Sequence, residues 1–110
     1  MGGKRRVVAT PFGLPTAIDL MGQSWKVEYV KLIDSDFSIL GNCDVTQHLI
    51  KICTDQSKGS MIRTLVHEIC HAYYYILPHS LPESAEETIV QLYTAIFVDM
   101  VGNKEYFWNY

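Results

Sequence analysis

The sequence lacks a long hydrophobic run. Nowhere do about eighteen apolar residues follow one another, which is the shortest run that spans a bilayer as a helix. The N-terminus also lacks the continuous apolar segment of a secretion signal, because prolines and glycine interrupt it between Pro11 and Pro15. We therefore expect a protein that is neither secreted by such a signal nor inserted in a membrane.

Cysteine is scarce. The three cysteines, Cys43, Cys53 and Cys70, are odd in number and have no paired spacing. This pattern does not suit a disulfide framework and favours a reducing compartment. Together with the missing signal segment, it predicts a cytoplasmic protein.

Positive charge is also limited. Nine Lys and Arg residues stand against 12 Asp and Glu residues, which gives a net charge of −3. Such a chain has no general basic surface to neutralise phosphates, so we expect no nucleic-acid partner. The basic cluster Lys4-Arg5-Arg6 is interpreted as part of a solvated N-terminal tail over residues 1 to 9.

What the sequence does contain is typical of one globular domain. Hydrophobic residues make up 48% of the chain and charged residues 19%, which separates it from disordered sequences. A length of 110 residues is enough for a single core. No repeat or linker divides the chain, so we expect one domain over residues 1 to 110.

The first half predicts short strands. Apolar and polar residues alternate over residues 24 to 30 and again over 47 to 53, as in half-buried strands. A short helix is predicted over 16 to 21, and a further short strand over 37 to 40 before a turn at Gly41-Asn42. The inward face of the first clear strand is expected to carry Trp25, Val27 and Tyr29.

The second half predicts two long helices. The first should run from about Ser60 to Leu77 and end before Pro78. The second should begin near Pro82 or Ser84 and continue to about Val101. The predicted fold is therefore α+β, a small antiparallel sheet packed on two long helices.

A metal-binding motif lies in the first of these helices. Its residues are His67-Glu68-Ile69-Cys70-His71, a His-Glu-x-x-His pattern. Histidines four residues apart share one helical face, so both rings can reach a single metal ion, and Glu68 projects beside it as a general base. The helix is apolar nearly all round, and buried histidines need polar partners, which a metal supplies. Cys70 is expected to point away from this face and to serve packing.

A catalytic zinc also needs a third protein ligand. Glu86 is favoured, because on a helical wheel it falls within the apolar stripe that we expect to face the core. Glu83 and Glu87 remain alternatives, although each also fits a helix capping box, and Asp99 lies farther along the same helix. His79 is a fourth alternative, placed too far from His71 for the metzincin pattern. The predicted stripe comprises Ala85, Ile89, Leu92, Tyr93, Ile96 and Met100.

These features resemble the gluzincin metallopeptidases, in which a glutamate of the next helix completes the histidine motif. The short chain is similar to minigluzincins and to small metallopeptidases of phage and bacterial genomes, and more loosely to the ImmA/IrrE type. The resemblance covers about residues 20 to 103, and only the histidine–glutamate motif is specific. It implies a zinc ion on His67, His71 and Glu86, and Glu68 as the general base. It also implies that the strand over 47 to 53 is the sheet edge beside the cleft.

The expected function is that of a zinc-dependent endopeptidase, which hydrolyses peptide bonds of a peptide or protein substrate with metal-activated water. Because no subdomain follows the last helix, such an enzyme would be latent, narrow in substrate or completed by a partner. The alternatives are a non-catalytic, zinc-stabilised interaction domain of a phage or mobile element, and a hydrolase of non-peptide substrates. The substrate-binding residues and the oligomeric state stay open. No residue stands out as an oxyanion donor: the candidates are Tyr73, Tyr74, Tyr75 and Tyr93, but tyrosines beside an apolar helix are more often core residues.

Overall fold

A computed structural model describes residues 11–36 and 38–102 of the chain. The predicted N-terminal tail and the residues after Gly102 lie outside this part, as does Phe37 of the strand predicted over 37 to 40. The elements in chain order are β1 (Ala17–Leu20), β2 (Gln23–Val30), β3 (Gly41–Asp44), β4 (Leu49–Cys53), α1 (Lys58–Ile76) and α2 (Glu86–Gly102). Short 3-10 turns occupy Pro11–Gly13 and Glu83–Ala85.

The strands form one mixed sheet. Its four strands lie in the order β1-β2-β4-β3. The pairs β1–β2 and β3–β4 are antiparallel, whereas β2 and β4 are parallel. The α+β class is thus confirmed, but the prediction of a purely antiparallel sheet was wrong. After β2 the chain returns along the outer edge as β3, so β4 comes back beside β2 in the same direction.

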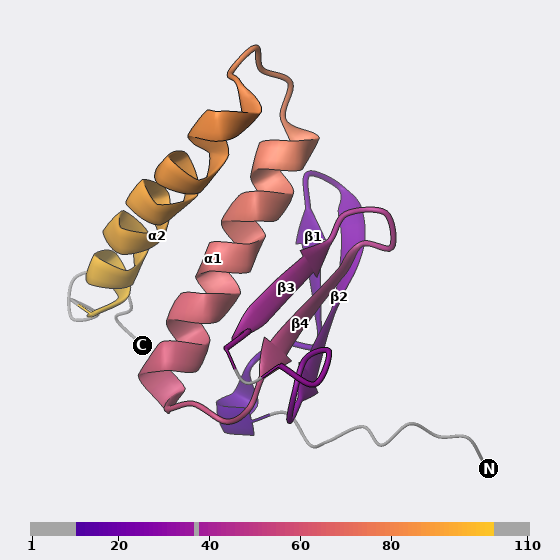
Figure 1. The fold of residues 1–110 in the computed structure, drawn as a ribbon, viewed down its shortest axis with the longest axis vertical. Coiled ribbons are helices and arrows are strands. Elements are labelled where there is room, and N and C mark those ends of the chain that lie inside the picture. The colour runs from indigo at the N-terminus through magenta and orange to yellow at the C-terminus, as the bar shows by residue number, and fades with distance from the viewer. Residues whose placement is uncertain (1–10, 37, 103–110) are drawn as a thin grey trace.

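The helices form two layers on one side of the sheet. Helix α1 packs against the sheet, and α2 packs on α1 from the side away from the strands (Figure 1). None of the helices in residues 11–36 and 38–102 combines the length and apolar character that crossing a membrane requires.

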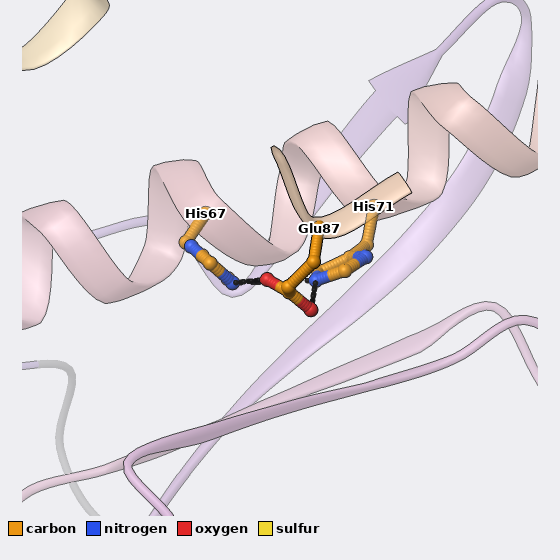
Figure 2. A group of neighbouring side chains, drawn as sticks. All are labelled: His67, His71 and Glu87. Carbon is orange, nitrogen blue, oxygen red and sulfur yellow. Dashed lines mark hydrogen bonds and ion pairs between the residues drawn. The ribbon is translucent and has the colours of Figure 1, made fainter. Parts of the chain in front are cut away.

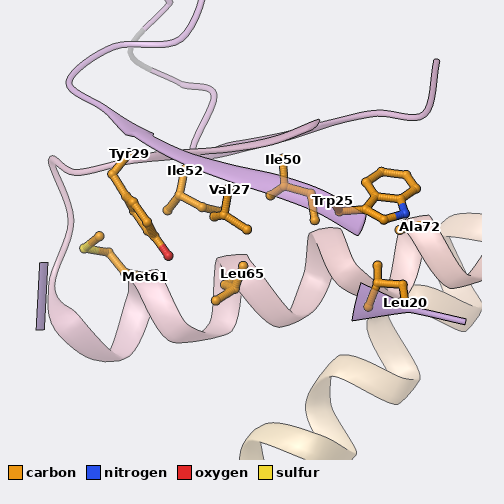
Figure 3. Close-up of a cluster of buried hydrophobic side chains, with 9 residues drawn as sticks. All are labelled: Leu20, Trp25, Val27, Tyr29, Ile50, Ile52, Met61, Leu65 and Ala72. Atoms are coloured by element: carbon orange, nitrogen blue, oxygen red, sulfur yellow. The ribbon is translucent and has the colours of Figure 1, made fainter. Parts of the chain in front are cut away.

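The core lies between the sheet and α1 (Figure 3). Residues at alternate positions of β2 and β4 point toward α1 and are buried, as strand geometry requires. The side chains of the core are Leu20, Trp25, Val27, Tyr29, Ile50, Ile52, Met61, Leu65 and Ala72. The predicted inward face of the 24–30 strand is confirmed. Burial of each large side chain contributes roughly 1.5–3 kcal/mol, so this cluster fixes α1 on the sheet.

Three local predictions in the first half were wrong. Of the strand predicted over 37 to 40, the described residues 38–40 form no strand. Residues 17–20 form β1 and not a helix, because they pair with β2 through a two-residue turn at Met21-Gly22. Gly41-Asn42 starts β3 and does not make a turn, because both residues pair with β4.

The helix boundaries agree with the sequence. Helix α1 begins after Ser57, whose hydroxyl accepts a hydrogen bond of 3.2 Å from the backbone N–H of Ser60, and it ends at Ile76 before Pro78. Helix α2 follows the 3-10 turn and ends at Gly102.

The buried face of α2 differs from the prediction. Val90 and Thr94 are buried against α1, whereas Leu92, Tyr93 and Ile96 of the predicted stripe are exposed. Helix α2 packs mainly on α1, and between Glu86 and Asp99 it buries only a narrow strip. The assumption that the widest apolar stripe faces the core was therefore wrong for this helix.

The turn between β1 and β2 yields a stability prediction. Met21 has φ 52° and Gly22 has φ 82°. A two-residue hairpin turn of this kind needs a positive φ at both positions. Asparagine tolerates this conformation far better than methionine does, and Met21 is exposed. Met21→Asn should raise the free energy of unfolding by about 0.5–1 kcal/mol in urea titration. Met21→Ala removes the exposed side chain but keeps the strain, so an equal gain in that control would contradict the explanation.

Candidate metal centre

His67 and His71 lie one turn apart on the exposed side of α1, away from the core. Their Nε2 atoms are 3.2 Å apart, and both side chains are partly buried. The helix sets this separation, because residues i and i+4 share one face and the rest of α1 is held by the core. The two ring nitrogens are thus aimed at one point.

Glu87, the second residue of α2, faces the same point (Figure 2). Its Oε1 lies 3.1 Å from Nε2 of His67, and its Oε2 lies 3.3 Å from Nε2 of His71. The three residues offer ligand atoms that all lie within 4.8 Å of one another. This carboxylate is largely exposed, so solvent reaches the group from the side of α2.

Glu86, the favoured third ligand from the sequence, lies beside the same histidines but contacts a different ring nitrogen. Its Oε2 is 2.8 Å from Nδ1 of His71, on the opposite side of that ring from Nε2. The reason is the orientation of α2: Val90 and Thr94 face α1, and at about 100° per residue Glu86 and Glu87 fall on the two flanks of that line. Glu87 therefore reaches the Nε2 atoms, and Glu86 reaches the back of one ring.

The contact of His71 with Glu86 and the lowered pKa of His67 both suit metal binding. When Nδ1–H of His71 donates to Glu86, its Nε2 keeps a free lone pair, as in carboxylate–histidine–metal arrangements. Burial lowers the pKa of His67, and the neighbouring His71 lowers it further, although Glu87 acts in the opposite direction. The deprotonated ring is the form that binds a metal.

Glu68 lines the inner wall of the site. Its side chain is only 8% exposed, and burial raises the pKa of its carboxyl group to about 7, a change that Glu87 increases and His71 opposes. A carboxylate with such a pKa can accept and release a proton near neutral pH.

A cavity of about 410 Å³ opens in front of these groups. Helix residues form one side, and strand β3 with the start of the following turn forms the other. The lining residues are Gly41, Asn42, Cys43, Val45, His67, Glu68, His71, Glu86 and Glu87. Burial raises the pKa of the Cys43 thiol to about 12, with a further rise from nearby carboxylates. Cys43 is therefore a protonated wall residue and not a nucleophile.

Sequence reasoning missed the part played by Gly41. A methyl group at this position would lie 2.5 Å from Cγ2 of Thr64 and 3.0 Å from Oε2 of Glu68. Strand β3 thus approaches α1 closely only because residue 41 has no side chain. The signal was a glycine within a pairing segment, which often marks close backbone approach.

The other candidates from the sequence have structural contacts. His79 fixes the loop after α1: its Nε2 lies 3.0 Å from the backbone O of Tyr74, and its Nδ1 accepts from N–H of Leu81 at 3.2 Å. Glu83 is exposed in the 3-10 turn and lies outside the metal group. Cys70 faces α2 and accepts a hydrogen bond of 3.8 Å from the hydroxyl of Thr94, in agreement with a packing role.

Two further expectations concern the walls of the cleft. The strand beside the cavity at the sheet edge is β3, whereas β4, predicted for that place, lies inside the sheet because β3 covers it. None of the four tyrosines considered as oxyanion donors lines the cavity formed by the described residues. Tyr74, for example, donates its hydroxyl to the backbone O of Pro82 at 3.1 Å.

No protein-family model, curated protein or solved structure matches the chain.

The close approach at Gly41 can be tested by substitution. Gly41→Ala should destabilise the fold by about 1–3 kcal/mol, because either β3 or the Thr64 and Glu68 side chains must move. Gly59→Ala is the control: its added methyl meets open space at the start of α1 and should leave stability unchanged or raise it by up to about 1 kcal/mol. Chemical denaturation of both variants gives the comparison. Equal effects would mean that the contact at Gly41 is relieved without cost.

Proposed function

We propose that the protein is a zinc-dependent endopeptidase that uses His67, His71 and Glu87 as metal ligands and Glu68 as general base. The observation that carries the proposal is the convergence of two ring nitrogens and one carboxylate beside a buried glutamate. The His67-Glu68-x-x-His71 pattern on α1 is that of zinc peptidases, and the gluzincin resemblance agrees with a glutamate ligand on the next helix.

The distances between these groups suit zinc. Zinc–nitrogen bonds of about 2.0–2.1 Å in a tetrahedral site place two ligand nitrogens about 3.3 Å apart, and oxygen ligands lie at similar separations. Here the nitrogen–nitrogen distance is 3.2 Å, and the two oxygens of Glu87 lie 3.1 Å from one ring nitrogen and 3.3 Å from the other. The donor set of two imidazoles and one carboxylate is also that of known catalytic zinc sites.

Three protein ligands leave one coordination position for the reaction. Bound here, zinc would polarise the scissile carbonyl and lower the pKa of a water molecule to about 7. Glu68 lies next to the ligands in the cavity wall, and its raised pKa suits a group that takes a proton from the attacking water and passes it to the leaving amine. Glu86 holds the His71 ring through Nδ1, so the ring keeps its orientation during these steps.

The shape of the site supports an extended polypeptide as substrate. Strand β3 borders the cavity and pairs with β4 on one side only, so its other edge can accept backbone hydrogen bonds from an added strand. A peptide bound in this way would pass in front of Glu68 and the histidines. The cavity runs between β3 on one side and residues of α1 and α2 on the other, which suits an extended chain laid along β3.

The metal ligands are tested by zinc content. Wild type purified with zinc should hold about one ion per chain by elemental mass spectrometry, and Glu87→Ala should lose most of it because one of three ligands is removed. Glu86→Ala should keep zinc but bind it about 10–100-fold more weakly in chelator competition, as expected for a group that only orients a ligand. Glu83→Ala serves as an exposed control with unchanged binding.

Two outcomes would count against this assignment. Zinc that is lost from Glu86→Ala and kept by Glu87→Ala would make Glu86 the third ligand. A wild type that binds no zinc would leave a hydrogen-bonded histidine–carboxylate cluster and no metal enzyme.

The catalytic step is tested at Glu68. Glu68→Gln should keep zinc and reduce the hydrolysis of unstructured fluorogenic peptides by about 10²–10⁴-fold, because the amide cannot accept the proton of the attacking water. Glu83→Gln, placed outside the cavity, should keep full activity. A Glu68→Gln variant with wild-type activity would remove Glu68 from this role. Stable zinc without hydrolysis in wild type would instead support the zinc-stabilised interaction domain.

A further inference from the structure

The outer face of α2 carries large apolar side chains in contact with solvent. Leu92 is 56% exposed, Tyr93 58%, Ile96 48% and Phe97 39%. Between Thr88 and Val98 the helix has no charged residue. The largest contiguous apolar patch of a soluble protein is often an interaction site.

The residues of this face follow helical spacing. Positions 92, 93, 96 and 97 are separated by three, four or one residues, so their side chains form one continuous stripe, with the half-buried Ile89 at its N-terminal end. Between Glu86 and Asp99, the fully buried residues of the helix are Val90 and Thr94, which face α1. The widest apolar stripe of α2 thus has no partner among the described helices and strands.

We propose that this stripe, residues 89, 92, 93, 96 and 97, binds a second copy of the chain through the same stripe. A surface without charge is complementary to itself, as a two-fold contact requires. With about half of each large side chain exposed, the stripe offers about 400 Å² per copy. Two copies with their surrounding residues would bury about 1,000 Å², the lower limit for a specific pair.

Charge selects the direction of the pairing. Acidic residues flank the stripe, with Glu86 and Glu87 before it and Asp99 after it. A parallel pair would place each acidic residue beside the same residue of the second copy, and the two negative charges would repel each other. An antiparallel pair centred between Tyr93 and Ile96 would place Glu87 near Gly102 and Asp99 near Val90 of the second copy, and would oppose the two helix dipoles favourably.

In this arrangement the two α1–α2 hairpins would form a four-helix layer with both α2 helices inside. Leu92 of each copy would face Phe97 of the other, and Tyr93 would face Ile96. Glu87, the proposed metal ligand on α2, lies at the N-terminal end of this helix. In an antiparallel pair the two candidate metal sites would therefore lie at opposite ends and stay accessible. The proposal therefore stands or falls independently of zinc binding and hydrolysis.

Analytical ultracentrifugation of the wild-type chain tests the association. The small area predicts a reversible dimer, so the mass should rise from 12.6 kDa toward twice that value between about 1 µM and 1 mM. Ile96→Lys should weaken dimer formation at least about tenfold, because two lysines would meet near the two-fold axis. Gln91→Lys is the matched control: it adds the same charge to an exposed site on another side of α2 and should leave the dimer intact.

Further variants test folding and direction. Circular dichroism shows whether Ile96→Lys is folded, and Leu92→Lys provides a second disruption if it is not. If the pair is antiparallel, a mixture of the Leu92→Lys and Phe97→Glu variants should form dimers, because residues 92 and 97 face each other. If dimers form only when Leu92→Lys is mixed with Leu92→Glu, the pair is parallel and the proposed geometry is overturned. A chain that is monomeric at every concentration overturns the proposal. So does a monomer that sediments with phosphatidylcholine vesicles and loses this binding in Ile96→Lys, because the stripe would then contact lipid.

Discussion

The packing of α2 on α1 is the constraint on which the candidate site depends. Helix α1 is held by the core, so the positions of His67 and His71 are set by the sheet side of the molecule. The carboxylates come from α2, which packs on α1 through Val90 and Thr94. The hydroxyl of Thr94 also donates a hydrogen bond of 3.8 Å to the sulfur of Cys70. The orientation of one helix thus decides which glutamate meets which ring nitrogen.

The polar groups of α1 also need this arrangement. His67, Glu68 and His71 are all wholly or partly withdrawn from water, and such groups are unfavourable without partners. Glu87 and Glu86 supply partners to the two rings. However, the Nε2 atoms of His67 and His71 lie close to each other and both face the carboxylate of Glu87 at hydrogen-bond distance. A cation at their centre would satisfy all three groups, and this is the physical reason for preferring a metal site over an ion-pair cluster.

Much of this structure could be predicted from local patterns. Alternation revealed β2 and β4, Pro78 marked the end of α1, and four-residue spacing paired the histidines. What failed depended on long-range packing: β1 and β3 are strands because of their neighbours, and the mixed sheet follows from the path of the chain. The choice among the glutamates for the third ligand depends on the same packing. A helical wheel gives the angles between residues, but it cannot give the rotation of the helix against its neighbour.

That rotation also explains the exposed stripe. To bury Leu92, Tyr93 and Ile96 against α1, the helix would have to turn by about 120° around its axis, given about 100° per residue. The same turn would carry Glu87 away from the histidines, so the apolar stripe and Glu87 cannot both face α1. Natural sequences that place a polar group at a site in this way lose burial elsewhere. The outward stripe is thus the physical consequence of bringing Glu87 to the histidines, and contact with a second copy would restore the apolar burial that α1 cannot provide.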